Sequence, residues 1–227
     1  MGGMTILGPT APLRLPIGTS DYAAVRREGF SYVDKTAWIA DVLDHPARVL
    51  LVPRPRRFGK TLNMTTLRYF LERSAEDRED LFGDTWIWTA AEGGYRQHFQ
   101  RYPVIYLTFK DIKETSWADA SLKLTRLLAE QMRHIERALP AGRELSSDDV
   151  QIAELQDHHT PVAVFSDMLR VATKLIHRCT GQPVVVLIDE YDTPLHAAWR
   201  NGYWNEAVSF FRGFLGGGLK DSPHLHK

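Results

Sequence analysis

Three short runs of apolar residues, each bounded by polar or turn-forming residues, are the strongest strand signals in the chain. They cover residues 49–52, 104–107 and 184–188. None alternates with polar residues, which is typical of strands that helices cover on both faces. The runs therefore predict a mainly parallel sheet inside an α/β fold.

Apolar residues at a spacing of three or four predict the helices between and after these strands. The predicted helices cover residues 60–73, 117–139, 163–177 and 203–214. Ser116 with Asp119 predicts a capping box for the second of them, and Gly181 is expected to end the third. The polar segment 141–160 is predicted to be an exposed excursion. This order of strands and helices is that of an α/β protein.

The composition is that of a soluble globular protein. The 227 residues include 28 Lys+Arg and 28 Asp+Glu, so no net charge attracts nucleic acid. The single cysteine, Cys179, cannot form an internal disulfide, which favours a cytoplasmic location. No apolar stretch approaches the roughly 20 residues that span a membrane. We interpret residues 1–15 as a loose tail and 16–227 as one domain with helical insertions.

The stretch LVPRPRRFGKT, residues 51–61, contains the second half of a phosphate-binding loop. The usual motif is Gly-x-x-x-x-Gly-Lys-Ser/Thr, but Arg54 stands where its first glycine is expected. Gly59 would let the backbone approach a phosphate, Lys60 would reach its oxygens, and Thr61 would supply a hydroxyl to Mg²⁺. By itself this tripeptide is equally compatible with a basic turn before a helix.

The third apolar run ends in an acid pair, Asp189 and Glu190. In ATPases with this pattern the first acid holds Mg²⁺ and the second polarises the attacking water. Solvated acids at the end of a core strand are the simpler interpretation of this pair alone. The two half-motifs together favour an ATP-binding protein. The nearby Asp192 would either reach that water or cap the turn before Pro194, and we favour the cap.

Three stretches together resemble a known family. They are LPIGTSDYAAVRREGFSYVDKT, LLVPRPRRFGKTLNMTTLRYFL and VVVLIDEYDTPLHAAW, and the resemblance extends over roughly residues 15–227. The chain resembles the AAA-ATPase-like proteins, whose loop characteristically has an arginine where Arg54 stands. The resemblance implies a P-loop NTPase three-layer sandwich. It also implies that residues 32–36 lie near the adenine.

The resemblance further implies the roles of individual residues. Residues 57–61 (Arg57, Phe58, Gly59, Lys60 and Thr61) would bind ATP, Thr61 and Asp189 would hold Mg²⁺, and Glu190 would be the catalytic residue.

In the resembled family another strand follows and lies between the loop strand and the acid strand. That strand, any later arginine sensor and the PD-(D/E)XK nuclease-like half of many members are expected to be absent from residues 1–227. The sheet is therefore predicted to be incomplete at the C-terminus, with unpaired backbone at its edges. Either the chain is a fragment or a truncated gene product, or a protein partner, self-association or a rearranged sheet fills the gap.

Three hypotheses for the function follow. The first is an ATP-binding domain whose Mg²⁺-dependent hydrolysis is weak or depends on a partner. The second is a non-hydrolysing module in which nucleotide orders a surface for a protein partner. The third is a nucleic-acid-binding module that uses Arg54, Arg56 and Arg57.

Two groups of side chains outside the motifs suggest no chemistry. The adjacent His158 and His159 are expected to point apart and to bind no metal. The aromatic residues near the C-terminus are expected to form core or a partner surface. These aromatic residues are Trp199, Trp204, Phe210, Phe211 and Phe214.

Overall fold

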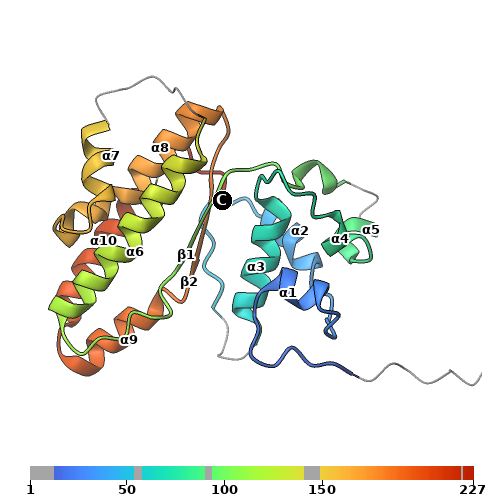
Figure 1. Ribbon diagram of the computed structural model, residues 1–227, viewed down its shortest axis with the longest axis horizontal. Coiled ribbons are helices and arrows are strands. Elements are labelled where there is room, and N and C mark those ends of the chain that lie inside the picture. The colour runs from blue at the N-terminus through green and yellow to red at the C-terminus, as the bar shows by residue number, and fades with distance from the viewer. Residues whose placement is uncertain (1–12, 54–57, 90–93, 141–148, 221) are drawn as a thin grey trace, which may run out of the picture.

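A two-stranded parallel sheet lies at the centre of the chain (Figure 1). The computed structural model describes residues 13–53, 58–89, 94–140, 149–220 and 222–227. Strand β1 (Val104–Thr108) pairs with β2 (Val185–Asp189), in a register that runs from Val104 opposite Val185 to Thr108 opposite Asp189. Helices lie on both sides of the sheet. The α/β class and two of the three predicted strands are therefore confirmed.

One group of helices buries the larger core against β1. It consists of α6 (Trp117–Ala138), α7 (Asp149–Gln156), η2 (Val162–Asp167), α8 (Met168–Thr180), α9 (Asp192–Asn201) and α10 (Trp204–Leu219). The side chain of Ser116 accepts a hydrogen bond from the Asp119 amide, as the predicted cap requires. Gly181 ends α8 in a left-handed conformation, with φ 66°, as predicted. In the aromatic set, Phe210, Phe211 and Phe214 are buried, whereas the side chain of Trp199 is 71% exposed.

A second group of helices covers the other side of the sheet (Figure 1). It consists of α1 (Tyr22–Arg27), α2 (Ala37–Asp44), α3 (Lys60–Leu71), α4 (Glu79–Phe82), α5 (Trp86–Thr89) and η1 (Arg96–His98). Its core is rich in aromatic rings: Phe82 lies 5.1 Å from Tyr22 and 5.3 Å from Phe70 between ring centroids. The Tyr22 hydroxyl donates to the carbonyl of Leu81 at 2.7 Å, so this buried polar group is satisfied. Helix α3 of this group packs against β2.

Two helical predictions need correction. Residues 163–167 belong to the 3₁₀ segment η2, so α8 begins only at Met168. The segment 141–160 is not simply exposed, because α7 buries Ile152 and Leu155 against α6 and α8. Two apolar residues in so short a helix give little periodic signal, although burial is what stabilises it. Residues 141–148 lie outside the described part of the chain.

The prediction of a strand at residues 49–52 is wrong. These residues form no strand, and the side chains of Val49 and Leu51 are 51% and 69% exposed. An apolar run forms a strand only where another strand can pair with it. Among the described residues, no neighbouring strand pairs with this run.

The C-terminal residues occupy part of the edge of β2 that faces away from β1. The Val184 amide donates a hydrogen bond to the His224 carbonyl, and the Val184 carbonyl accepts one from the His226 amide, both at 2.8 Å. The Val186 amide then donates to the Lys227 carbonyl at 2.9 Å. This segment runs parallel to β2. The edge is therefore paired at its beginning, and within the described chain this pairing ends at Val186.

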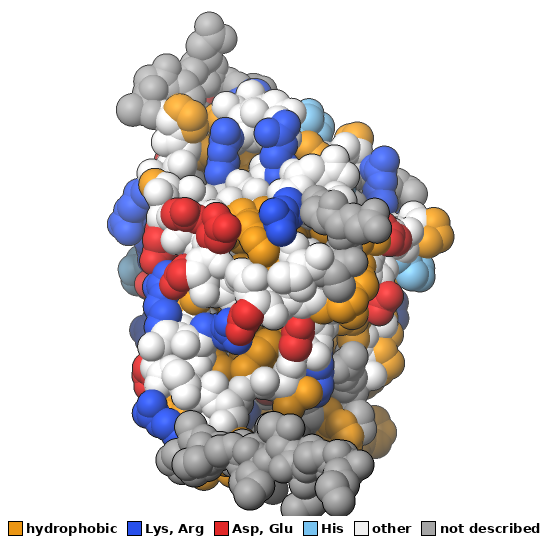
Figure 2. Space-filling model, turned by 90° about the vertical axis from the view of Figure 1, so that its right-hand side faces the viewer, with side chains coloured by type: hydrophobic (Ala, Val, Ile, Leu, Met, Phe, Trp, Pro, Cys, Tyr) orange, Lys and Arg blue, Asp and Glu red, His pale blue; other side chains and the backbone are white. Residues whose placement is uncertain are grey.

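Side chains of both signs alternate over the face that the N-terminal helices form (Figure 2). Arg26 pairs with Asp84, and Arg27 pairs with Glu76 and Asp80 at 2.7 and 3.3 Å. A nucleic-acid interface needs a patch of one sign. The described side chains of this face do not form such a patch.

Candidate functional site

Helix α3 begins at the predicted loop. Gly59 precedes it with φ 71°, a left-handed conformation that glycine adopts without a Cβ penalty, and no side chain caps the helix. The first amides of a helix and its dipole attract an anion. Lys60 is the first helical residue and Thr61 the second. The end of α3 therefore has the chemistry of a phosphate site.

The two predicted half-motifs meet in the structure. The Thr61 hydroxyl donates to a carboxylate oxygen of Asp189 at 2.7 Å, although the residues are 128 positions apart. Asp189 ends β2 and is only 2% exposed. A carboxylate and a hydroxyl are both hard oxygen donors of the kind Mg²⁺ takes. The residues present at this point therefore fit a magnesium ion.

Glu190 is held in a strained conformation beside this pair. Its φ is 52°, which is uncommon for a residue with a side chain and is often found at functional sites. One oxygen of its carboxylate accepts a hydrogen bond from the Thr193 hydroxyl at 2.8 Å. The Glu190 amide donates to Asp189 at 3.0 Å. The turn from β2 into α9 thus fixes both acids.

Asp192 does not cap the turn before Pro194, which corrects the preferred interpretation. It is the first residue of α9, and its carboxylate lies 3.8 Å from the Lys60 ammonium and 3.6 Å from His196. The lysine and aspartate side chains are 29% and 43% exposed, so the ion pair contributes little to stability. An anion arriving at α3 would compete with Asp192 for Lys60.

Tyr106 of β1 lies in the electrostatic environment of the same acids. Burial, reinforced by the negative charge of Asp189, raises the pKa of Tyr106 to about 12. The guanidinium of Arg68 lies 5.2 Å from the centroid of its ring. The phenol therefore stays protonated at neutral pH and can donate a hydrogen bond.

The remaining predicted site residues lie in the segments before α3 and α2. Arg57 lies outside the described residues, together with Arg54 and Arg56, and the Phe58 side chain is 61% exposed. In the box at residues 32–36, Asp34 accepts from the Trp86 amide at 2.6 Å and so joins α2 to α5. This contact gives the box a structural role.

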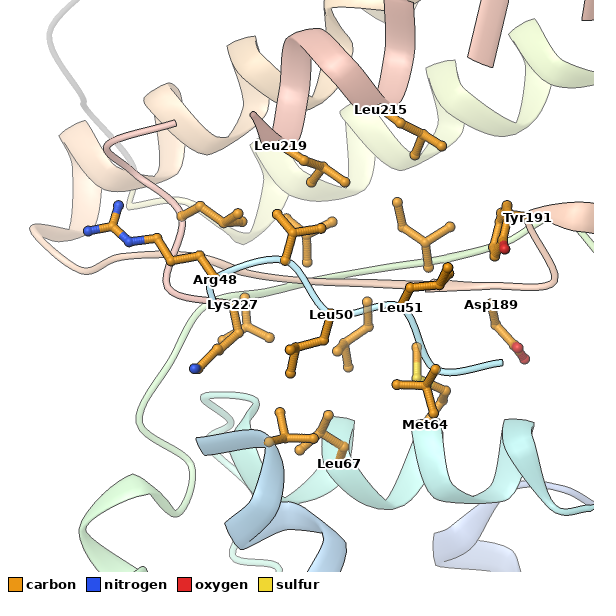
Figure 3. Close-up of a pocket in the computed structure, with 18 of the residues that line it drawn as sticks. Arg48, Leu50, Leu51, Met64, Leu67, Asp189, Tyr191, Leu215, Leu219 and Lys227 are labelled. Atoms are coloured by element: carbon orange, nitrogen blue, oxygen red, sulfur yellow. The ribbon is translucent and has the colours of Figure 1, made fainter. Parts of the chain in front are cut away.

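The edge of β2 next to the site borders a cavity of about 640 Å³, which we call the β2 cavity (Figure 3). Residues 49–52 form the wall opposite β2. Met64 and Leu67 of α3 line one side, and Leu215 and Leu219 of α10 line the other. Asp189 lies at one end of the cavity and Arg48 at the opposite end. The side chains that line the cavity are mostly apolar.

The expectation that His158 and His159 point apart is wrong. They lie in a turn after α7, and their ring centroids are 4.1 Å apart. Together with Asp157 they bring three ligand atoms within 4.8 Å of one another. All three residues are exposed, and exposed groups of this kind are common without an ion.

Sequence reasoning missed Tyr106, Thr193 and His196 as neighbours of the site. Thr193 could have been predicted as a neighbour of Glu190 from its position three residues later, because a turn after a strand brings such residues together. Tyr106 and His196 offered no comparable signal. Their positions depend on how β1 and α9 pack against the rest of the chain.

Comparison with known proteins identifies the sequence family. The profile of the family described as "Predicted AAA-ATPase" matches residues 16–227. A curated relative from Azotobacter chroococcum mcd 1, described as an uncharacterized protein in the vnfD 5' region, is 29% identical over 184 residues. The match covers 80% of this chain and 30% of the relative, so the chain spans less than a third of that protein. No solved structure matches the chain significantly.

No helix among the described residues is both long and apolar enough to cross a membrane.

Proposed function

We propose that this chain, which belongs to the predicted AAA-ATPase family, binds ATP with Mg²⁺ and hydrolyses it. The observation that carries the proposal is the hydrogen bond of 2.7 Å between Thr61 and Asp189. It joins a phosphate-loop sequence to an acid pair at the end of a parallel strand, as a nucleotide site requires. Residues 16–227 would then form one P-loop domain of three layers.

Each side chain has a distinct task in this proposal. The amides that begin α3 and the Lys60 ammonium bind the phosphates, and Gly59 allows the backbone to approach them. Thr61 and Asp189 would hold Mg²⁺, which when bound neutralises charge on the phosphates. Glu190 acts as the base that orients and polarises a water molecule.

Two contacts must change when nucleotide binds. Lys60 has to leave Asp192, 3.8 Å away, and Glu190 has to exchange its bond to Thr193 for a water molecule. The ion pair between Lys60 and Asp192 is exposed enough for a charged ligand to replace it.

The second candidate is a switch that binds nucleotide without hydrolysing it. The bond of 2.8 Å from Thr193 to Glu190 favours it, because a carboxylate held this way is not free to activate water. Turnover above background that depends on Glu190 would exclude the switch. A nucleic-acid-binding function has no comparable support among the described residues.

Titration calorimetry with Mg-ATP tests the proposal on the unaltered chain, Lys60→Ala and Glu190→Gln. Losing a charge-assisted contact to phosphate costs about 1.5–3 kcal/mol, so Lys60→Ala should weaken binding about 10- to 100-fold. Glu190→Gln should retain binding and lose turnover. Lys110→Ala, an exposed lysine that follows β1, is the matched control. Equal affinity of the unaltered chain and Lys60→Ala would contradict the proposal.

A further inference from the structure

Three side chains that can each supply a metal ligand lie together in the turn after α7. We propose that Asp157, His158 and His159, which we call the Asp-His-His cluster, bind a late first-row divalent cation such as Zn²⁺. The cluster lies between α7 and η2, whereas the phosphate site is formed by α3 and the end of β2. The proposal therefore does not rest on nucleotide binding. It rests on the fold of the turn, on its hydrogen bonds and on the chemistry of the three side chains.

The turn brings both imidazole rings to one place. The expectation that they bind no metal assumed a regular element, in which adjacent side chains point apart. Instead, the ring centroids of His158 and His159 are 4.1 Å apart, with 39° between the ring planes. One ligand atom from each histidine and one carboxylate oxygen of Asp157 all lie within 4.8 Å of one another.

Small rotations of the side chains would complete the coordination. With bonds of about 2.0–2.2 Å to zinc, the ligand atoms of a tetrahedral site stand roughly 3.3 Å apart. The three atoms of the cluster therefore have to approach one another by no more than about 1.5 Å. Exposed side chains change rotamer within picoseconds to nanoseconds, so this approach needs no movement of the backbone.

Hydrogen bonds hold the backbone of the turn in this conformation. The carboxylate of Asp157 accepts a hydrogen bond from the His159 amide at 2.9 Å. The Asp157 carbonyl accepts one from the Thr160 amide at 3.1 Å, and the Thr160 hydroxyl donates to the Glu154 carbonyl at 2.9 Å. None of these bonds needs a metal ion. The backbone that carries the ligands is thus ordered beforehand, which reduces the entropic cost of binding.

The ligand atoms have no competing partner in the described part of the chain. There, neither imidazole forms a hydrogen bond through its ring nitrogens, and no cation pairs with Asp157. The guanidinium of Arg133, which lies beside the turn, donates to the carbonyl of Gln156. Exposure by itself indicates no site, but it leaves the three ligand atoms accessible to an ion from solution.

Two nitrogen ligands and one oxygen ligand determine which ions fit. Imidazole nitrogen suits Zn²⁺, Cu²⁺ and Ni²⁺, whereas Mg²⁺ and Ca²⁺ take oxygen ligands. Three protein ligands leave one position of a four-coordinate zinc ion for water. The histidines must be neutral to bind the ion, so binding has to weaken as the pH falls.

Titration calorimetry with ZnCl₂ tests the proposal on the full chain without nucleotide. We expect saturable binding in the micromolar range, and at least about tenfold weaker binding by His158→Ala and by His159→Ala. Even residues that only orient a metal ligand contribute about 10- to 100-fold in affinity, so losing a ligand has at least this effect. His134→Ala, which removes an exposed histidine of α6 outside the cluster, is the matched control and should bind normally.

Two further measurements separate the metal ligands from the structure of the turn. Asp157→Asn keeps a side-chain oxygen that can accept from the His159 amide but loses the charge, so it should weaken Zn²⁺ binding while the chain stays folded. Circular dichroism checks the fold. Saturating Zn²⁺ should raise the melting temperature of the unaltered chain more than that of the double variant His158→Ala/His159→Ala.

Four results would overturn the proposal. They are no saturable binding of Zn²⁺ up to about 1 mM, equal affinity of the unaltered chain and the double variant, an equal loss of affinity in His134→Ala, and unchanged affinity in Asp157→Asn. An affinity that stays constant between about pH 7.5 and pH 5.5 would also contradict it, because the ligands would then not be imidazole nitrogens.

Discussion

Replacing Gly218 of α10 with alanine is expected to destabilise the chain. A Cβ built on Gly218 would lie 2.3 Å from the Cβ of Leu169 on α8, and 3.1 and 3.2 Å from its Cδ1 and Cγ. Carbon atoms without a bond between them normally stay about 3.5–4.0 Å apart. Both Cβ atoms are attached to backbone and cannot rotate away. The two helices would therefore have to move apart by more than 1 Å, on the scale of that contact distance.

The magnitude follows from two opposing effects. Forcing an extra carbon into a packed interface costs about 1–3 kcal/mol. Replacing glycine with alanine inside a helix contributes about 0.5–1 kcal/mol of stability. Because the clash joins two backbone-anchored atoms, we expect the upper part of the first range to apply. Gly218→Ala should therefore lower the free energy of unfolding by about 1–2 kcal/mol.

Gly217→Ala is the matched control. It lies in the same helix, is exposed, and its added Cβ would meet nothing within 4 Å. It should raise the free energy of unfolding by about 0.5–1 kcal/mol. Urea denaturation followed by circular dichroism gives both values, provided that the slope with urea is unchanged. A Gly218→Ala midpoint at or above that of the unaltered chain would refute the close packing of α8 and α10.

Three further predictions concern the site and the C-terminal segment. Thr61→Val should weaken Mg-ATP binding and Thr61→Ser should retain it, because serine keeps the hydroxyl that bonds Asp189; equal calorimetric affinities would contradict this role. Asp192→Asn should tighten nucleotide binding by up to about fivefold by freeing the lysine of α3, and a lower affinity in the same titration would mean that Asp192 contacts the ligand. Burial lowers the pKa of His226, so the folded chain favours its neutral form. Stability should be full above about pH 6.5 and fall as the pH drops below it, as urea midpoints would show; His226→Phe, which can keep the ring stacking, should reduce that fall.

Those parts of the site that depend on local sequence could be predicted. Gly59, Lys60 and Thr61 begin a helix, and Asp189 ends a strand, as expected from their neighbours. A glycine followed by a helical pattern predicts the start of a helix, and an acid after an apolar run predicts the end of a strand. Both signals depend only on a few adjacent residues. The contact of Thr61 with Asp189 then followed from the usual pairing of these motifs.

The parts that depend on packing between distant elements could not be predicted. Asp192 faces Lys60 because of the angle at which α9 leaves β2, and no pattern in the sequence encodes that angle. The histidines after α7 lie together because the turn folds back, whereas the prediction assumed a regular element. Ile152 and Leu155 are buried in a helix too short to show a period.

The failed strand prediction at residues 49–52 and the β2 cavity have one physical cause. Hydrophobic patterning reports that a segment is suited to burial, but a strand also needs backbone hydrogen bonds from a neighbour. The run at 49–52 has the first property and lacks the second, so its side chains stay partly in water. Among the described residues, the edge of β2 that faces away from β1 also lacks a paired neighbour beyond Val186.

Strand β2 borders both the candidate phosphate site and the β2 cavity. β2 ends in Asp189, which bonds Thr61, and the edge of β2 borders the cavity over the preceding residues. Lys60 and Glu190 also line the cavity at this end. The phosphate site and the β2 cavity therefore share part of their lining.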